Sequence, residues 1–199
     1  MRVNTLFGDW RRIAVAVGVW LVGCGSVAGG NPAVTAPYQF ACPVPVRSFE
    51  EVQRVRESES ADEPWRSSDD AGVQVTAAMQ AEIEVLVRDF LACSAAGEPL
   101  RVWSLYSDSY LARLMNRERG YDRVRYEMDL EPRPLGSEAR PILRSLSPAM
   151  AHGDGHVVTR VVIWYPNLER EKDLEWRFVR VAGEWRIDEI DGEITFAVP

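Results

Sequence analysis

Apolar residues recur at helical spacing in one stretch of the chain. Between residues 76 and 97, five of them follow one another at steps of three or four: Met79, Ile83, Leu86, Phe90 and Cys93. This spacing predicts a helix with one apolar face. Thr76 is suited to cap its start, and Gly97 is suited to end it.

A second helical stretch follows at residues 98–115. Pro99 suits the first turn of a helix. The apolar residues predict a helix to about Tyr106, then a break, then a second helix capped by Ser107 or Asp108.

The next residues, 116–141, are charged and irregular, and we expect them to form an excursion over the mouth of the domain. Beyond them the pattern predicts strands within residues 142–151, 157–165, 174–181 and 184–190. Asp154 and Gly155 predict a hairpin turn before the second strand, and residues 168–173 predict the next turn.

The last two strands predict a hairpin whose loop is Ala182 and Gly183, so that the residue pairs count outward from it. The expected pairs are Val181 with Glu184, Phe178 with Ile187, Arg177 with Asp188, and Trp176 with Glu189. One face then carries Trp176, Phe178, Trp185 and Ile187, and we expect it in the core. The other carries Arg177, Val179, Arg186 and Asp188, and we expect it to be largely wet. An ion pair between Arg177 and Asp188 on such a face would contribute little stability.

The beginning of the chain has the pattern of an export signal. Arg11 and Arg12 precede an apolar run of ten residues, Ile13–Val22. A helix that crosses a bilayer needs roughly 20 apolar residues. A basic start followed by a short apolar run is instead typical of a signal segment.

The residues at the end of this run resemble the bacterial lipobox. They read Leu21-Val22-Gly23-Cys24. In that family the chain is cut before the cysteine, which becomes lipidated, and this implies a domain anchored through Cys24 outside the cytoplasmic membrane or in the cell envelope. The alternative is cleavage after Ala28, which would discard Cys24 and secrete the protein.

The composition then divides the chain into four parts. Residues 1–23 are the export signal, and residues 24–37 are small, uncharged and rich in Pro and Gly, as in a flexible tether. Residues 38–73 form an arm with a short helix expected over 47–57 and an acidic linker. Residues 74–199 are long enough for one domain.

The charge of the chain excludes some partners. It has 23 basic and 30 acidic residues, a net charge of −7. Removal of residues 1–23 would leave 20 basic and 29 acidic residues, a net charge of −9. Because affinity for phosphate backbones and anionic lipids comes from Lys and Arg, we expect no nucleic-acid partner, and any membrane attachment must be covalent.

Two cysteines remain after Cys24. Outside the cytoplasm Cys42 and Cys93 are a plausible disulfide, which would tie the arm to a helix. The alternative is that Cys93 is a small core residue.

The expected order of helices followed by antiparallel strands resembles the nuclear-transport-factor-two-like superfamily, which includes SnoaL-like cyclases and ketosteroid isomerases. The helices of this pattern are "LVRDFLACSAAGEPLRVWSLYSDSYL", and the last hairpin is "LEWRFVRVAGEWRIDEI". The resemblance covers residues 75–195. It implies an α+β fold in which helices pack on a strongly curved antiparallel sheet, a cone-shaped α+β barrel around a cavity. The superfamily contains enzymes, binders and dimerisation modules, so the fold does not give the function.

Glu189 is the candidate base for an enzyme of this kind. In the expected register it lies on the apolar face with Trp176, where its pKa would be raised. Trp103, Tyr106 and Tyr110 complete the candidate pocket, which would suit an apolar or aromatic ligand. The other interpretation is that Glu189 reaches water or pairs with an arginine.

His152 and His156 flank the predicted turn, with Asp154 between them as a third metal ligand. The alternative is a polar turn with solvated imidazoles, and zinc sites need three or four well-placed ligands. The sequence contains no nucleophile elbow, phosphate loop, Cys-x-x-Cys or dinucleotide fingerprint. We therefore expect no metal and no cofactor.

Three functions remain open. The first is a tethered module that binds a small apolar molecule in its cavity or contacts a protein, including a second copy of itself, through its sheet. The second is a SnoaL-like enzyme that carries out proton-transfer chemistry. The third is a structural module with a filled core that dimerises through the sheet.

Overall fold

A computed structural model describes residues 42–58, 71–117 and 121–191 of the chain. All of them fall within one unit, Tyr38–Pro199. The signal segment, the lipobox and the tether lie outside the described residues. Within those ranges, no helix has the length and apolar character needed to cross a membrane.

Helix α1 (Phe49–Glu57) begins with a capping box. The Ser48 hydroxyl accepts from the backbone N–H of Glu51, whose carboxylate accepts from the backbone N–H of Ser48. The helix buries Val52 and Val55. The short helix expected in the arm is therefore confirmed.

Helix α2 (Ala77–Ala95) confirms the expected apolar face. The Thr76 hydroxyl accepts from the backbone N–H of Met79 at 3.3 Å and caps the helix. Ile83, Leu86, Phe90 and Cys93 are buried. After the helix, Gly97 has a φ of 66°, a conformation that glycine adopts without strain.

The predicted break between two helices is also present. Helix α3 (Pro99–Ser104) has Pro99 in its first turn, and helix α4 (Asp108–Arg117) follows. The Ser107 hydroxyl accepts from the backbone N–H of Tyr110 at 3.0 Å, which makes Ser107 the cap.

Residues 116–141 are less irregular than expected. They contain helix α5 (Arg123–Asp129) and the short η1 (Ser137–Ala139). The Asp122 carboxylate caps α5 by accepting from the backbone N–H of Arg125 at 2.9 Å. Seven residues are too few for apolar periodicity to reveal a helix.

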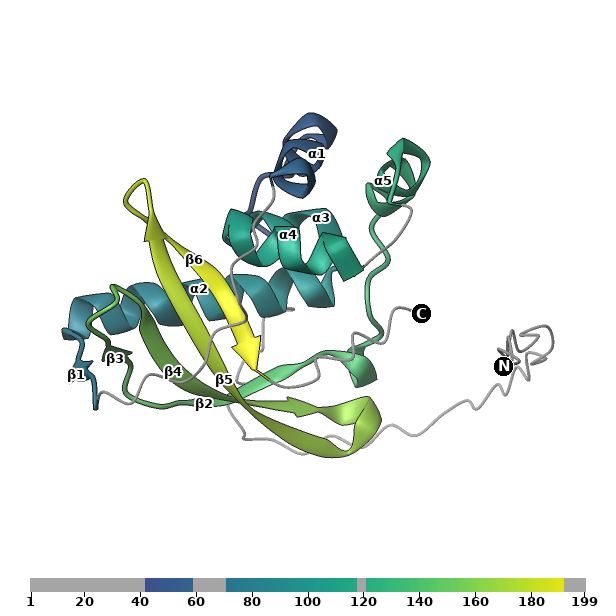
Figure 1. Ribbon diagram of the computed structural model, residues 1–199. Helices are drawn as coiled ribbons and strands as arrows, with labels where there is room; N and C mark the ends of the chain where they lie inside the picture. Colours follow the sequence, from purple (N-terminus) through teal and green to yellow (C-terminus); the bar gives the residue numbers. More distant parts are fainter. Residues whose placement is uncertain (1–41, 59–70, 118–120, 192–199) are drawn as a thin grey trace, which may run out of the picture. The chain divides into compact units, whose positions relative to one another are not determined.

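Six strands form one antiparallel sheet. They are β1 (Val73–Gln74), β2 (Ile142–Leu146), β3 (Met150–Ala151), β4 (Val157–Tyr165), β5 (Arg170–Val181) and β6 (Glu184–Asp191). The order is β1-β3-β4-β5-β6, with β2 also paired to β4, and the described strands do not close into a barrel. Helices α2, α3 and α4 lie over one face of this sheet (Figure 1). The fold class is α+β.

Two turns can be compared with the sequence. The turn at Asp154 and Gly155 is confirmed between β3 and β4. The turn expected at residues 168–173 is present but lies earlier, because η2 (Pro166–Leu168) and Glu169, with a φ of 47°, already reverse the chain. Strand β5 therefore begins earlier than expected, at Arg170.

The register of the last hairpin is partly confirmed. Phe178 pairs with Ile187, but Arg177 pairs with Glu189 and Trp176 with Ile190. The expected pairs of Arg177 with Asp188 and of Trp176 with Glu189 are therefore wrong. A β-bulge makes Asp188 an extra residue in β6, and beyond it every side chain of that strand changes face.

The core lies between α2 and the sheet. Phe90 and Trp176 meet edge to face, with 4.8 Å between their ring centroids, and Trp176 and Phe178 are fully buried. Cys42 and Cys93 form a disulfide with 4.6 Å between their Cα atoms. The bridge fixes the arm to the last turn of α2.

Candidate functional site

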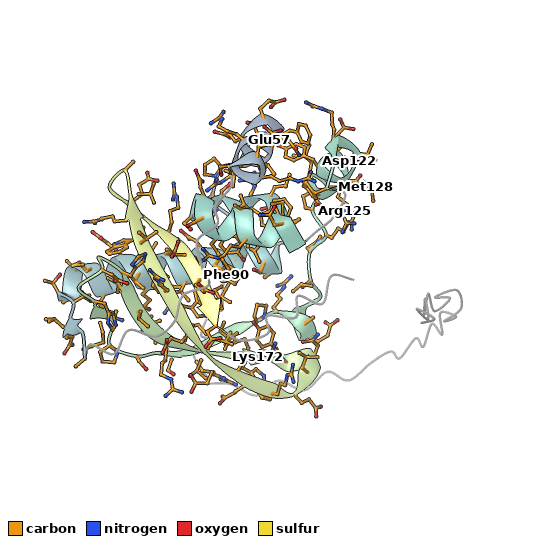
Figure 2. The ribbon with its side chains drawn as sticks, in the orientation of Figure 1. Glu57, Phe90, Asp122, Arg125, Met128 and Lys172 are labelled. Atoms are coloured by element: carbon orange, nitrogen blue, oxygen red, sulfur yellow. A yellow bond between two sulfur atoms is a disulfide. The ribbon has the colours of Figure 1, made fainter. Side chains whose placement is uncertain are left out.

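A cavity of about 710 Å³ lies between the helices and one end of the sheet. Its walls come from α2 to α5, from the segment that follows α5, and from the turn after β4. The lining residues used below are Phe90, Glu98, Trp103, Tyr106, Met128, Leu135, Ala139 and Tyr165. Figure 2 shows Phe90 in the interior, and Arg125 and Met128 on α5.

The segment after α5 forms one wall, as the expected excursion over the mouth would. Two backbone hydrogen bonds fix this segment to the end of α2. The N–H of Arg133 donates to the carbonyl of Gly97 at 3.0 Å, and the N–H of Leu135 donates to the carbonyl of Ala95 at 2.9 Å. A Cβ atom on Gly97 would lie 1.8 Å from the carbonyl oxygen of Arg133. Gly97 therefore permits this close approach as well as ending the helix.

Aromatic rings cover the deep side of the cavity. Tyr106 is 2 % exposed and packs between Phe90 and Tyr110, with ring centroids 6.2 and 4.8 Å away. Trp103 packs edge to face on Tyr121 at 5.0 Å. These rings make the interior suited to an apolar ligand.

The cavity tyrosines are neutral hydrogen-bonding groups. Burial, followed by the nearby Tyr110 and Tyr165 hydroxyls, raises the pKa of Tyr106 well above its usual value. Burial also raises the pKa of Tyr165 to about 12. At physiological pH both phenols can donate and accept hydrogen bonds but do not act as bases.

Charged residues of both signs line the cavity. The carboxylate of Glu98 lies 3.4 Å from the guanidinium of Arg101. The other charged lining residues are Arg125, Asp129, Glu131 and Arg133. A site with one apolar side and charges of both signs fits an uncharged or amphipathic molecule better than a simple ion.

The structure brings together only part of the predicted pocket. Trp103 and Tyr106 line the cavity, and Tyr110 packs directly behind Tyr106. Trp176 is fully buried in the core instead of lining the cavity. Leu135, Ala139 and Tyr165 were missed, because tertiary contacts bring them to the cavity and no local pattern marks them.

Glu189 does not occupy the position proposed for a base. Because the bulge moves it off the apolar face, it lies opposite Arg177, and its carboxylate is 3.3 Å from the guanidinium of Arg113. It is not among the described residues that line the cavity. Of the two interpretations of Glu189, the structure supports pairing with an arginine.

The bulge creates a polar cluster that the sequence analysis missed. Asp188 accepts hydrogen bonds from the hydroxyls of Ser107 and Ser109, at 2.6 and 2.9 Å. Its second carboxylate oxygen lies 3.5 Å from Nε2 of His156 and 3.6 Å from Nε of Arg177. The ion pair of Arg177 with Asp188 is thus present, but the expected wet face is wrong here, because their side chains are only 12 % and 9 % exposed.

The histidine turn joins this cluster. Nδ1 of His156 lies 3.2 Å from the carboxylate of Asp154, and the backbone N–H of His152 donates to the carbonyl of His156. Burial alone would raise the pKa of Asp154. The pKa is nevertheless lowered, because the carboxylate accepts from the backbone N–H of His156 and lies near the His156 ring and Arg177. Across the described residues, no three His, Cys, Asp or Glu side chains are arranged to hold a metal.

Comparison with known protein families finds no model that matches this chain, and comparison with curated proteins finds no matching relative. Functional inference therefore depends on the site itself. The cavity and the polar cluster are separate features, since no member of the cluster named above is among the described residues that line the cavity.

Proposed function

We propose that this chain is a membrane-tethered extracytoplasmic domain that binds a small, mainly apolar molecule in its cavity. The observation that carries the proposal is the cavity of about 710 Å³ with Phe90, Trp103 and Tyr106 on its deep side. Sites for small organic ligands typically have volumes of roughly 300–1,000 Å³ and apolar walls with a few polar groups. The alternative of a purely structural module predicted a filled core without such a cavity.

The ligand is expected to carry at least one hydrogen-bonding group on an apolar body. Tyr106 and Tyr165 offer neutral hydroxyls within the apolar lining. Binding is favoured over proton-transfer catalysis because Glu189, the proposed base, pairs with Arg113 outside the cavity.

Two features support a location outside the cytoplasm. The disulfide between Cys42 and Cys93 suits an oxidising compartment. The lipobox-like residues Leu21–Cys24 supply the covalent tether. We further propose that the helices and the open antiparallel sheet are a member of the nuclear-transport-factor-two-like superfamily, in the cone-shaped form described above.

The ligand site can be tested by filling it. Ala139 is partly buried and lines the cavity, so we expect Ala139→Trp to occupy the binding space. The matched control is Val124→Trp, at a position on α5 that is 65 % exposed and does not line the cavity. Binding of the neutral dye Nile red should weaken about tenfold, equivalent to about 1.4 kcal/mol, in the first variant and remain unchanged in the second.

Native mass spectrometry of the three proteins gives the second readout. A small molecule that copurifies with the wild type and the control, but not with Ala139→Trp, would support the site. Equal dye binding by all three proteins, with no copurifying molecule, would rule out the cavity as the binding site.

The tether has its own test. Cys24→Ser removes the thiol that a lipid would modify, so the protein should move from the membrane fraction to the soluble fraction. Retention of the variant in the membrane fraction would contradict the lipid anchor.

A further inference from the structure

Helix α5 forms part of the cavity wall, but it has little packing of its own. Three of its residues, Arg125, Met128 and Asp129, line the cavity. Tyr126 is the only buried residue of the helix. Because a short helix depends on tertiary packing for its stability, the contacts of Tyr126 determine where α5 lies.

The arm provides the contacts of Tyr126. The ring of Tyr126 meets the ring of Phe49 edge to face, with 5.4 Å between their centroids, and its hydroxyl donates to the backbone carbonyl of Arg47 at 2.7 Å. Tyr126 is not among the described residues that line the cavity. It therefore joins α5 to the arm, and it is not placed to touch a ligand.

Two further contacts join the arm to the N-terminal end of α5, which lies beside α1 (Figure 1). The guanidinium of Arg56 donates to the backbone carbonyl of Tyr121 at 2.8 Å. The guanidinium of Arg123 pairs with the carboxylate of Glu50 at 2.8 Å and lies 4.4 Å from the centre of the Phe49 ring. The arm thus contacts α5 at its start and at its buried residue.

The arm is itself fixed to the helices on the deep side of the cavity. Its first described residue, Cys42, is bonded to Cys93 in the last turn of α2. On α3, the guanidinium of Arg101 donates to the backbone carbonyls of Cys42 and Val44. A continuous set of contacts therefore runs from the disulfide through the arm to α5.

We propose that the arm positions α5 as a wall of the ligand cavity, with Tyr126 as the positioning residue, so that the disulfide controls the affinity of the cavity. When the bridge is cut, the start of the arm gains freedom, α5 loses support, and Met128 and Arg125 no longer hold their places in the wall. The statement about affinity rests on the proposed function. The statement about the position of α5 does not depend on a ligand.

The first test measures Nile red binding to variants of the full chain. Cys42→Ala cuts the bridge on the arm side and leaves α2 unchanged, and Tyr126→Ala removes the side chain by which the arm holds α5. Each variant should bind the dye about tenfold more weakly than the wild type. Because both changes act through the same contacts, the combined variant should bind at most about twofold more weakly than either one. Effects that multiply, or wild-type affinity in either single variant, would overturn the proposal.

Two control variants separate positioning by the arm from a general effect on α5. Tyr126→Phe keeps the ring contact with Phe49 and loses one hydrogen bond, so its affinity should stay within about threefold of the wild type. Glu127→Ala changes an exposed neighbour on α5 that does not line the cavity, and it should bind the dye like the wild type. Equal weakening by Glu127→Ala and Tyr126→Ala would refute the role of the arm.

The second test uses amide hydrogen exchange and no ligand. The backbone N–H of Leu130 donates to the carbonyl of Tyr126 at 3.1 Å, so its exchange reports on α5. It should exchange about tenfold faster in Cys42→Ala and in Tyr126→Ala than in the wild type and Glu127→Ala. Equal rates in all four proteins would overturn the positioning of α5 by the arm. Faster exchange in the two variants, with no dye bound by the wild type, would support the positioning and refute the proposed function alone.

Discussion

Gly97 shows how a single residue determines the shape of the cavity. Gly97 has a φ of 66°, and a Cβ atom on it would lie 1.8 Å from the carbonyl oxygen of Arg133. The substitution Gly97→Ala therefore combines backbone strain with a steric clash. We expect a loss of about 2–4 kcal/mol in the free energy of unfolding, measured by urea denaturation.

Gly183 is the matched control for this prediction. It also has a positive φ, 88°, but a Cβ atom there would meet nothing within 4 Å. Gly183→Ala should therefore show the cost of strain alone, about 1 kcal/mol. Equal losses in the two variants would mean that the wall at Arg133 moves away without cost.

Tyr165 makes stability depend on pH in the alkaline range. Its pKa is raised to about 12 in the folded protein, against about 10 in an unfolded chain. Since the folded state then binds the proton more tightly, this stabilisation is complete below about pH 10 and is lost as the pH rises to about 12. Unfolding measured by urea at several pH values should show this decline, and Tyr165→Phe should reduce its slope. An unchanged slope in that variant would contradict the assignment.

At the scale of elements, local sequence signals predicted most of the helices. The features that these signals did not reveal, such as the bulge in β6, depend on tertiary contacts. Ser48, Thr76 and Ser107 bond to backbone groups within the next three residues, so their effect can be read from neighbouring letters. The bulge in β6 reflects a wider requirement: Ile187 and Ile190, three residues apart, must both reach the core. Strict alternation can bury only one of them, and this spacing was the signal that could have revealed the bulge.

The bulge also makes a prediction for Asp188. Asp188→Ala removes the acceptor for the hydroxyls of Ser107 and Ser109 and the counter-ion of Arg177, all of them largely buried. We expect a loss of about 2–4 kcal/mol in the free energy of unfolding.

Asp173→Ala is the control for Asp188→Ala. The Asp173 side chain pairs with Arg160 across β4 and β5, but the two side chains are 48 % and 65 % exposed. Such a pair contributes less than about 1 kcal/mol. A similar loss from both substitutions in urea denaturation would show that the polar cluster does not hold the bulge.

At the scale of the whole molecule, the α+β class followed from the sequence, but one wall of the cavity did not. Trp103 on α3 and Tyr106 just after it line the cavity, and both were candidates because this stretch of the chain has clear local signals. The opposite wall depends on Gly97 accepting a hydrogen bond from residue 133, a contact between distant parts of the chain that no periodicity encodes. The arm, in turn, is fixed by one covalent bond.

That bond gives the prediction for the whole domain. Cys42 and Cys93 are separated by 51 residues in sequence, and crosslinking them restricts the unfolded chain more than the folded one. For a loop of this length the entropic contribution is about 4 kcal/mol, and native disulfides typically contribute about 2–4 kcal/mol. Replacing both cysteines with alanine should lower the free energy of unfolding by about 2–4 kcal/mol.

The variant should still fold, because the arm also buries Val52 and Val55 against the domain. In urea denaturation, the double variant Cys42→Ala with Cys93→Ala should have the same stability as the reduced wild type. A wild type whose stability does not change on reduction would show that packing alone holds the arm in place.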